Sequence, residues 1–454
     1  MSIKYIEGFA GIGGFRLGFE QACAELGIEP ECAFAFEKDK FAKQTYLANF
    51  GEEPAGDITK IPSKDIPGRK SKDDILFFFA GFPCQPWSTA GKQLGVNDER
   101  NMIPQVTRII LDKQPDVFIL ENVKGLKSKK FKDVYDRLMW DLKVICGYTV
   151  YERIYNAKAV VPQNRERIFI VGFKNQIDFE FPELPPLYPV LKDVLEFKDV
   201  PEKYFLKEKT WQYLQKKQSN KKYGFGFNIA NIAGYTNTLP ARYGNDGYDI
   251  LVPEISRWNP YHRIAGLDEQ ANTITAQYGS NGGAATLIPE LRKIGNISKS
   301  QTKRIYDING ISPTLCSGGE GHLGGWNGFF NVPELKQIGK INKGSQGQRI
   351  YDINGLSVTL GALGGGQGAK TGLYAVPEII EIDGIKYIVD YSRVRRLMPR
   401  ECARVMGFLD DFKIVVSDTQ AYKQFGNAVV PGVVKEISKA VIKIIFNKFK
   451  SKEI

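Results

Sequence analysis

Short apolar runs alternate with helical patterns over residues 1–175. Phe15, Phe19, Ala22 and Leu26 recur at helical spacing after the first run, and Gly27 is placed to end that helix. Such alternation is typical of an α/β fold with a mostly parallel sheet. We therefore predict that the chain opens with a strand, a glycine turn and a helix. The apolar runs are Lys4–Ile6, Ala33–Phe36, Ile75–Ala80, Val117–Leu120 and Ile168–Gly172.

A cluster of prolines between Pro182 and Pro189 marks a predicted domain boundary. Beyond it, RIYDINGISPTL begins at Arg304 and RIYDINGLSVTL begins at Arg349, with weaker copies near residues 238 and 273. The repeats end near residues 253, 289, 333 and 377. Each strong copy holds an Asn-Gly pair, at 309–310 and 354–355, which favours a hairpin. Stacked hairpins and a four-bladed propeller both fit this pattern.

Helical periodicity returns near the carboxyl terminus. Pro399 suits a first helical turn and Gly407 suits a stop. A final apolar stripe predicts an amphipathic helix that docks on the core. The stripe consists of Val434, Ile437, Val441, Ile444 and Ile445.

Composition narrows the class of protein. The 454 residues are 43% hydrophobic and 25% charged, as in an ordinary globular protein, and no apolar run or leader pattern predicts membrane insertion or export. We expect a soluble, cytoplasmic protein. The six cysteines lack CxxC spacing, and His262 and His322 are the only histidines, so we predict no metal site, disulfide framework or Ser-His-Asp triad.

The net charge of +11 is concentrated in two stretches. Residues 201–224 carry seven basic and two acidic side chains, and residues 391–454 carry thirteen and six. Such patches attract polyanions, although a solvated lysine-rich surface explains them equally well.

Three features of the first 60 residues suggest a nucleoside pocket. The glycine turn Phe9–Phe15 follows the first strand, although its spacing is not GxGxxG. Glu37 follows the second strand, where a carboxylate can bind ribose hydroxyls. Asp57 offers an acceptor for an adenine amino group. Each feature by itself is weak.

Cys84 lies between two prolines directly after the apolar strand Ile75–Ala80. This places its thiol at the carboxyl edge of the sheet, as a positioned nucleophile requires. Cys23, Cys32 and Cys402 fit helical or strand patterns and are interpreted as small hydrophobic residues.

Glu121 ends the next strand and is a candidate acid. Arg165 and Arg167 should point to the same side of the following strand, where they could polarise a carbonyl or hold a phosphate. An ion pair with Glu166 is the structural alternative.

Together these motifs resemble the DNA (cytosine-5) methyltransferases. FAGIGGF, Glu37, GDIT, GFPCQPWS, ENV, QNRERIFIVGF, RRLMPRECARVMGF and QFGNAVVPGVV occur in the order of that family. The resemblance covers residues 1–175 and 391–445. It implies a Rossmann-like S-adenosylmethionine-dependent domain of residues 1–182, completed by 415–454. Residues 183–414 would form a mostly β and loop target-recognition domain built of the repeats.

The resemblance implies a covalent mechanism. Cys84 would add to carbon 6 of cytosine while Glu121 binds the exocyclic amine and ring nitrogen 3, so that carbon 5 becomes nucleophilic. Arg167 would hold the carbonyl oxygen and lower the pKa of the thiol, with Arg165 in support. Water or hydroxide would remove the carbon 5 proton.

The resemblance also assigns binding residues. The base must leave the duplex, and the residues expected to fill the gap and contact DNA are Gln85, Ser88, Lys92 and Arg100. The cofactor pocket is expected to comprise Phe9, Gly11, Ile12, Gly13, Glu37, Asp57, Ile58, Pro83, Asn427 and Val429. The sequence departs from the family at Glu7-Gly8, where Asp-Leu is usual, and at Asn101, where glycine is common.

The leading hypothesis is sequence-specific methylation of cytosine carbon 5 in double-stranded DNA with S-adenosylmethionine and no metal. We expect a monomer without membrane contact, functionally paired with a restriction endonuclease. A tRNA methyltransferase and a catalytically silent DNA-binding module are alternatives. A flavin or nicotinamide oxidoreductase is a remote third.

Overall fold

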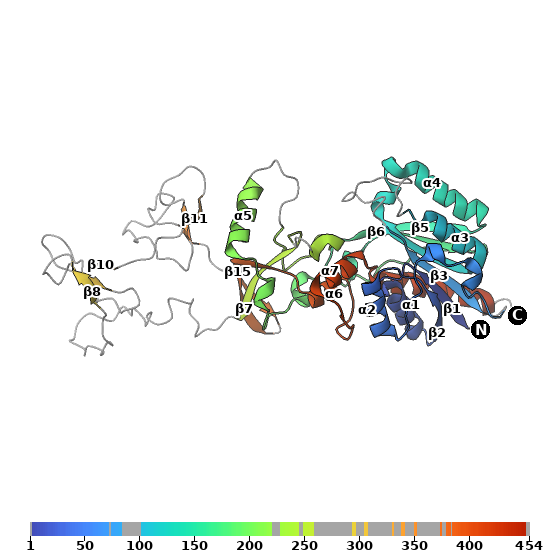
Figure 1. The fold of residues 1–454 in the computed structure, drawn as a ribbon, viewed down its shortest axis with the longest axis horizontal. Coiled ribbons are helices and arrows are strands. Elements are labelled where there is room, and N and C mark those ends of the chain that lie inside the picture. The colour runs from blue at the N-terminus through green and yellow to red at the C-terminus, as the bar shows by residue number, and fades with distance from the viewer. Residues whose placement is uncertain are drawn as a thin grey trace. The chain divides into compact units, whose positions relative to one another are not determined.

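A computed structural model describes residues 2–71, 74–83, 101–219, 228–244, 248–257 and 384–450, together with short strands between residues 293 and 382. Two compact units are distinguished by their internal contacts (Figure 1). The first comprises residues 1–254 and 391–454, and the second comprises residues 255–390.

A six-stranded sheet forms the centre of the first unit, with the strand order β2-β1-β3-β4-β6-β5. The strands β1, β2, β3 and β4 pair in parallel, whereas β6 runs antiparallel to both β4 and β5. Only β6 therefore runs against the other strands of this sheet, so the sheet is mostly parallel, as predicted, with one reversed strand. The strands are β1 (Ile3–Gly8), β2 (Pro30–Ala35), β3 (Ile75–Gly81), β4 (Val117–Val123), β5 (Thr149–Asn156) and β6 (Glu166–Phe173).

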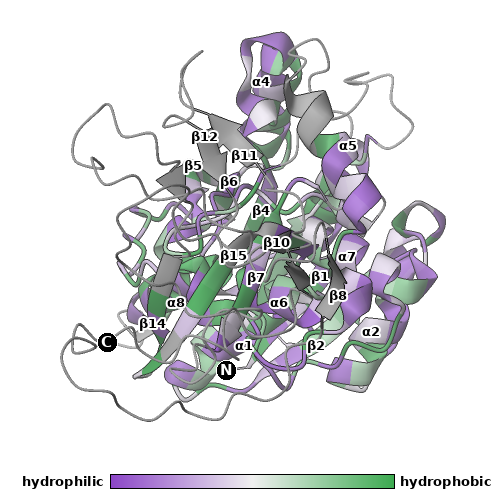
Figure 2. Cartoon of the chain, turned by 90° about the vertical axis from the view of Figure 1, so that its left-hand side faces the viewer, coloured by the Kyte–Doolittle hydropathy of each residue, from purple (hydrophilic) through white to green (hydrophobic). Residues whose placement is uncertain are grey.

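All five predicted apolar runs correspond to strands of this sheet, and β5 is the strand that the pattern did not reveal. Its sequence TVYERIYN is largely half-buried and carries Glu152 and Arg153, so its hydrophobicity is too low to signal a core strand. Figure 2 shows how hydropathy differs between a core strand and an outer helix: β4 is green, which marks hydrophobic residues, and α5 is largely purple, which marks hydrophilic ones.

Helices cover both faces of the sheet. Ile109 and Leu138, from α3 and α4, pack in one core with Phe78 and Phe118. On the other face Phe19 of α1 contacts Phe77 and Phe79. The helices of the first unit are α1 (Gly14–Glu25), α2 (Lys40–Phe50), α3 (Ile103–Lys113), α4 (Lys132–Trp140), α5 (Glu208–Ser219), α6 (Pro399–Val405), α7 (Asp418–Asn427) and α8 (Pro431–Lys450).

The predicted carboxyl-terminal helix is α8, and it returns to the start of the chain. A side chain at Gly18 would collide with Pro431 and Val434, so α1 and α8 approach closely. Lys435 and Lys439 of α8 both pair with Glu25 of α1. The predicted stops are also confirmed, because Gly27 and Gly407 have φ values of 69° and 79° directly beyond their helices.

The strongest repeats of the second unit form two sheets of matching strand order. In each, the Arg-Ile-Tyr strand lies between one antiparallel and one parallel partner. The sheets are β8 (Lys293–Asn296), β9 (Arg304–Tyr306) and β10 (Phe329–Phe330), and β11 (Gln337–Lys340), β12 (Arg349–Tyr351) and β13 (Leu373–Tyr374). The predicted Asn-Gly turns lie outside the described residues. A further sheet has the order β14-β15-β7 and contains β7 (Leu251–Arg257), β14 (Glu378–Ile382) and β15 (Ile385–Arg396).

The first unit is larger than the predicted catalytic domain. It continues past residue 182 to 254 and resumes at 391 rather than 415. Residues 236–239 run beside the segment Pro162–Asn164, which explains this extension. The division of function between residues 1–182 with 415–454 and residues 183–414 stays a prediction. No described helix has the length and apolar character of a membrane span.

Candidate active site

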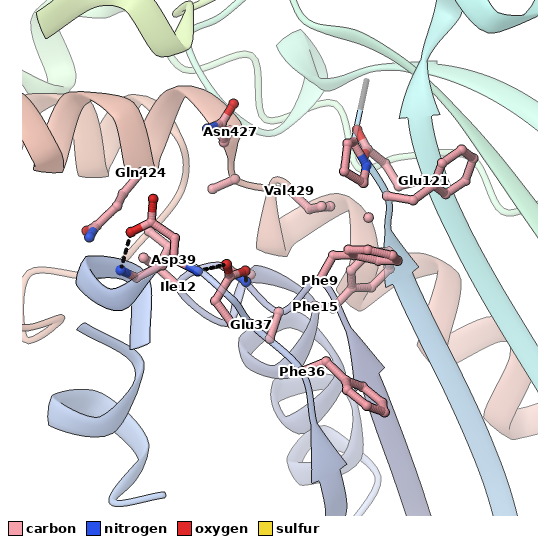
Figure 3. Close-up of a pocket in the computed structure, with 18 of the residues that line it drawn as sticks. Phe9, Ile12, Phe15, Phe36, Glu37, Asp39, Glu121, Gln424, Asn427 and Val429 are labelled. Atoms are coloured by element: carbon pink, nitrogen blue, oxygen red, sulfur yellow. Dashed lines mark hydrogen bonds between the residues drawn. The ribbon is translucent and has the colours of Figure 1, made fainter. Parts of the chain in front are cut away.

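A cavity of about 200 Å³ opens at the carboxyl ends of β1, β3 and β4. This is the edge at which open α/β sheets bind ligands. Three regions of the chain line it: the ends of the first strands with the segments that follow them, residues around the start of β6, and the end of α7 with the connection to α8. Figure 3 shows Glu121 on one side of the cavity and Glu37 with Asp39 on the other.

Glu37 ties the glycine turn to the start of α2. Its carboxylate accepts a hydrogen bond from Gly11 N at 2.8 Å and another from Asp39 N at 2.7 Å. Burial raises the pKa of Glu37, and these two backbone donors oppose the rise. Phe9, in the same turn, has a φ of 56°, which is uncommon for a residue other than glycine. Because such strain needs support from its surroundings, the turn is a preformed part of the cavity.

Asp57 and Ile58 form the neighbouring wall. Asp57 Oδ1 accepts from Thr59 N at 3.0 Å and from Thr59 Oγ1 at 2.8 Å, which lowers the pKa of Asp57. Ile58 is 3% exposed and Phe36 is 1% exposed, so this wall combines apolar surface with one carboxylate. Such a lining suits a flat heterocycle with an exocyclic amine.

Glu121 and Arg167 form an ion pair at the other end of the cavity. Arg167 Nε lies 3.0 Å from Glu121 Oε1, and both side chains are mostly buried. Burial raises the pKa of Glu121, while the charges of Arg167 and Arg165 lower it. Arg167 Nη1 donates to the carbonyl of Glu166 at 2.8 Å, and no bond to a described residue engages Nη2. Glu166, the alternative ion-pair partner, instead pairs with Lys124, while Arg167 pairs with Glu121.

Arg165 also lines the cavity, but its guanidinium is directed at the main chain. Nη2 donates to the carbonyls of Gly426 and Ala428 at 3.2 and 2.8 Å, and Nη1 donates to that of Leu239 at 3.4 Å. Arg165 is 2% exposed.

The end of α7 and the connection to α8 complete the wall with Asn427 and Val429. This connection lies against the glycine turn, because a Cβ at Gly14 would come within 2.6 Å of the Val429 carbonyl oxygen. Gln424 of the QFGNAVV motif also lines the cavity and was not among the predicted site residues. Its Oε1 accepts from Thr45 Oγ1 at 3.0 Å, whereas its buried Nε2 has no partner among the described residues. A cavity wall with an unused amide donor fits a ligand that carries acceptor oxygens.

Asn122 is a second residue near the site that was not among the predicted site residues. It is 1% exposed, and its Nδ2 donates to the Phe82 carbonyl at 3.1 Å. This bond fixes the end of β3 against the end of β4, two residues before Cys84. The ENV motif could have revealed Asn122, because a buried amide at the end of a strand must find hydrogen-bond partners.

Most predicted site residues that the structure describes meet at this cavity. Gly13 does not line it, and a Cβ there would instead meet the ring of Phe50 at 2.2 Å. Cys84, Gln85, Ser88, Lys92 and Arg100 lie outside the described residues. The predicted residues that line the cavity are Phe9, Gly11, Ile12, Glu37, Asp57, Ile58, Pro83, Glu121, Arg165, Arg167, Asn427 and Val429.

Comparisons with known proteins decide which family has this site. The model of the C-5 cytosine-specific DNA methylases matches residues 3–443. The chain belongs to this family. The methylase is 38% identical to the type II methyltransferase M.NlaX of Neisseria lactamica over 322 residues, which is 67% of this chain and 98% of that protein. It is 32% identical to M.BanI of Aneurinibacillus aneurinilyticus over 473 residues, with 96% and 95% covered.

Solved structures agree on the fold of the methylase. The Entamoeba histolytica methyltransferase EhMeth has a TM-score of 0.55 at 16% identity, with 99% of both chains covered. The Dnmt2 methyltransferase of S. pombe has a TM-score of 0.52 at 14% identity, with 98% of both covered. At these identities the likeness concerns the fold alone. Family membership makes the protein a DNA (cytosine-5) methyltransferase, which favours the leading hypothesis over a tRNA enzyme, a silent module and an oxidoreductase.

Proposed function

We propose that this methylase modifies a specific sequence in double-stranded DNA through a covalent bond between Cys84 and a flipped-out cytosine, as the modification enzyme of a type II restriction-modification system. One observation carries the proposal. A single cavity joins the pair Glu121 and Arg167 to the nucleoside-binding end around Glu37, with Pro83, the residue before Cys84, in its wall.

The chemistry follows from the inertness of cytosine carbon 5, which is a poor nucleophile in an aromatic ring. The Cys84 thiolate forms a bond to carbon 6, and the electron pair of the 5,6 double bond becomes available at carbon 5. Glu121 binds the exocyclic amine and protonates or hydrogen-bonds ring nitrogen 3, a role supported by its raised pKa. Arg167 holds the carbonyl oxygen through its remaining donors. After carbon 5 gains the methyl group, a water or hydroxide takes its proton, and the carbon 6 to sulfur bond breaks to return the thiolate.

The methyl donor is proposed to be S-adenosylmethionine, which supplies an electrophilic methyl group when bound. Glu37 would accept from the ribose hydroxyls, and Asp57 would accept from the adenine amine beside Ile58. Phe9, Gly11, Ile12, Pro83, Asn427 and Val429 would surround the remainder of the cofactor. No protein metal is needed for these steps.

DNA contacts are proposed for two parts of the chain. Gln85, Ser88, Lys92 and Arg100 would fill the gap left by the flipped base and bind phosphates. The repeats of residues 183–414 would read base edges through loops of different sequence. The names of relatives such as M.NlaX and M.BanI support a role beside a restriction endonuclease.

The nucleophile can be tested by trapping. The protein is incubated with S-adenosylmethionine and with duplex DNA containing 5-fluorocytosine, from which the carbon 5 substituent cannot leave as a proton. We expect a denaturant-resistant adduct with the unaltered protein and none with Cys84→Ser. Cys146→Ser is the matched control, because this buried thiol lies outside the cavity and should leave trapping intact. Adduct formation by Cys84→Ser would refute the mechanism.

The substrate is tested separately with a library of random duplexes. Bisulfite sequencing should reveal 5-methylcytosine within one or a few short motifs. Methyl incorporation into tRNA in place of DNA, or marks without any shared motif, would contradict the proposed specificity.

A further inference from the structure

Two arginines two residues apart in the QNRER motif do different work. Arg165 and Arg167 both line the cavity, and the resemblance placed Arg167 at the cytosine with Arg165 in support. Their bonds separate them. Arg167 contacts the carboxylate of Glu121, whereas Arg165 donates to the main-chain carbonyls of Leu239, Gly426 and Ala428.

The acceptors of Arg165 come from two distant segments. Gly426 and Ala428 flank Asn427, the last residue of α7, and Leu239 begins the segment that packs on this helix end. The packing is tight, because a Cβ at Gly426 would lie 2.5 Å from Ala241 N. One buried guanidinium therefore ties the start of β6 to both segments.

Counting hydrogens shows how Nη2 of this group is used. Nη2 carries two hydrogens, and the carbonyls of Gly426 and Ala428 use both. A guanidinium buried to this degree must keep such partners, because an unpaired charge in the interior is costly. Nη2 of Arg165 is thus committed to the protein, while Nη2 of Arg167 has no described partner.

We infer that Arg165 is a positioning residue that holds Asn427 and Val429 in place as a wall of the cofactor pocket. This inference rests on the proposed cofactor and refines its site. It assigns Arg165 to cofactor binding and leaves contact with the cytosine to Arg167. Because Arg167 lies in β6 and Arg165 directly precedes this strand, one short segment aligns the cofactor wall with the base-binding end.

The test measures S-adenosylhomocysteine binding without DNA by calorimetry, in parallel with the rate of 5-fluorocytosine adduct formation. Lysine keeps the charge but cannot bridge several carbonyls as the planar fork does. Arg165→Lys should raise the Kd for S-adenosylhomocysteine by about tenfold or more, since hydrogen bonds from a charged donor are lost. The matched control, Arg167→Lys, should keep this Kd within about twofold while adduct formation slows by about a hundredfold.

Each outcome decides the question. Normal S-adenosylhomocysteine binding by Arg165→Lys, with slow adduct formation only, would assign Arg165 to the base and overturn the inference. Failure of the unaltered protein to bind S-adenosylhomocysteine would instead refute the proposed cofactor. Amide exchange in the unaltered protein provides a measurement that needs no variant. Residues 426–428 should exchange slowly without ligand, and exchange as fast as in an unfolded segment would exclude the clamp.

Discussion

Two buried arginine–glutamate pairs show how similar chemistry serves different ends. Arg395 and Glu401 share two bonds of 2.7 Å at the start of α6, and they are 2% and 0% exposed. Backbone N–H groups of Glu196 and Met398 also donate to Glu401. Both Nη atoms of Arg395 and both carboxylate oxygens of Glu401 are engaged, so the pair fastens residue 196 to the carboxyl-terminal segment.

The pair of Glu121 and Arg167 is incomplete by comparison. One bond of 3.0 Å through Nε joins it, and both side chains line a cavity. The fully bonded pair of Arg395 and Glu401 stabilises the fold locally, whereas the singly bonded pair of Glu121 and Arg167 retains donors and acceptors for a substrate. The comparison predicts that loss of the first pair costs stability and that loss of the second costs activity.

The largest effect is expected for Glu121→Gln. The amide keeps the shape of the side chain but removes the acid and its attraction to Arg167, so methyl transfer should fall by about 10²–10⁴-fold. The free energy of unfolding should change little, because the pair is partly open to the cavity. Methyl incorporation into DNA and urea unfolding measure the two quantities. Near-normal methyl transfer would show that Glu121 is not the acid.

Glu401→Gln should give the opposite pattern. The change leaves the buried charge of Arg395 without a counter-charge, and breaking a buried pair costs about 3–5 kcal/mol. Urea unfolding should show this loss, while the methyl transfer of the remaining folded protein stays near normal at low temperature. An unchanged unfolding free energy would mean that the two pairs do not differ as the structure indicates.

Glu7 provides a third comparison, for which a smaller effect is expected. It is a buried carboxylate that accepts no hydrogen bond from an arginine side chain among the described residues. It accepts from Arg16 N at 3.2 Å and from Tyr46 Oη at 3.0 Å, and so caps α1, whose N-cap residue Gly13 has no side chain. Burial raises the pKa of Glu7 to about 8, above its ordinary value of 4.5.

The raised pKa fixes the sign of the pH dependence. Between pH 4.5 and 8 the folded protein holds a proton that the unfolded chain releases, so the contribution of Glu7 to stability declines as the pH rises. Unfolding of Glu7→Gln, measured over this range, should lack that part of the decline. Parallel curves for the variant and the unaltered protein would show that Glu7 is ionised in both states.

The local pattern of the sequence predicted many elements correctly. The apolar runs gave five of the six strands of the main sheet, and the glycine and proline signals located the ends of α1 and α6. The half-buried β5 was missed because its polar and apolar residues do not alternate clearly. Its pairing with β6 stabilises it as a strand. The antiparallel direction of β6 was likewise invisible, since strand direction depends on the connection that precedes the strand.

By itself, the sequence determined the family and the identity of the candidate chemical groups, because motif order and residue type are properties of the chain. Only the tertiary structure decided which groups meet. Glu121 and Arg167 are 46 positions apart, and Arg165 lies more than 250 residues from two of the carbonyls it holds, those of Gly426 and Ala428. Spacing along the chain could not distinguish Arg165 from Arg167, because hydrogen-bond partners depend on which distant segments fold against each side chain.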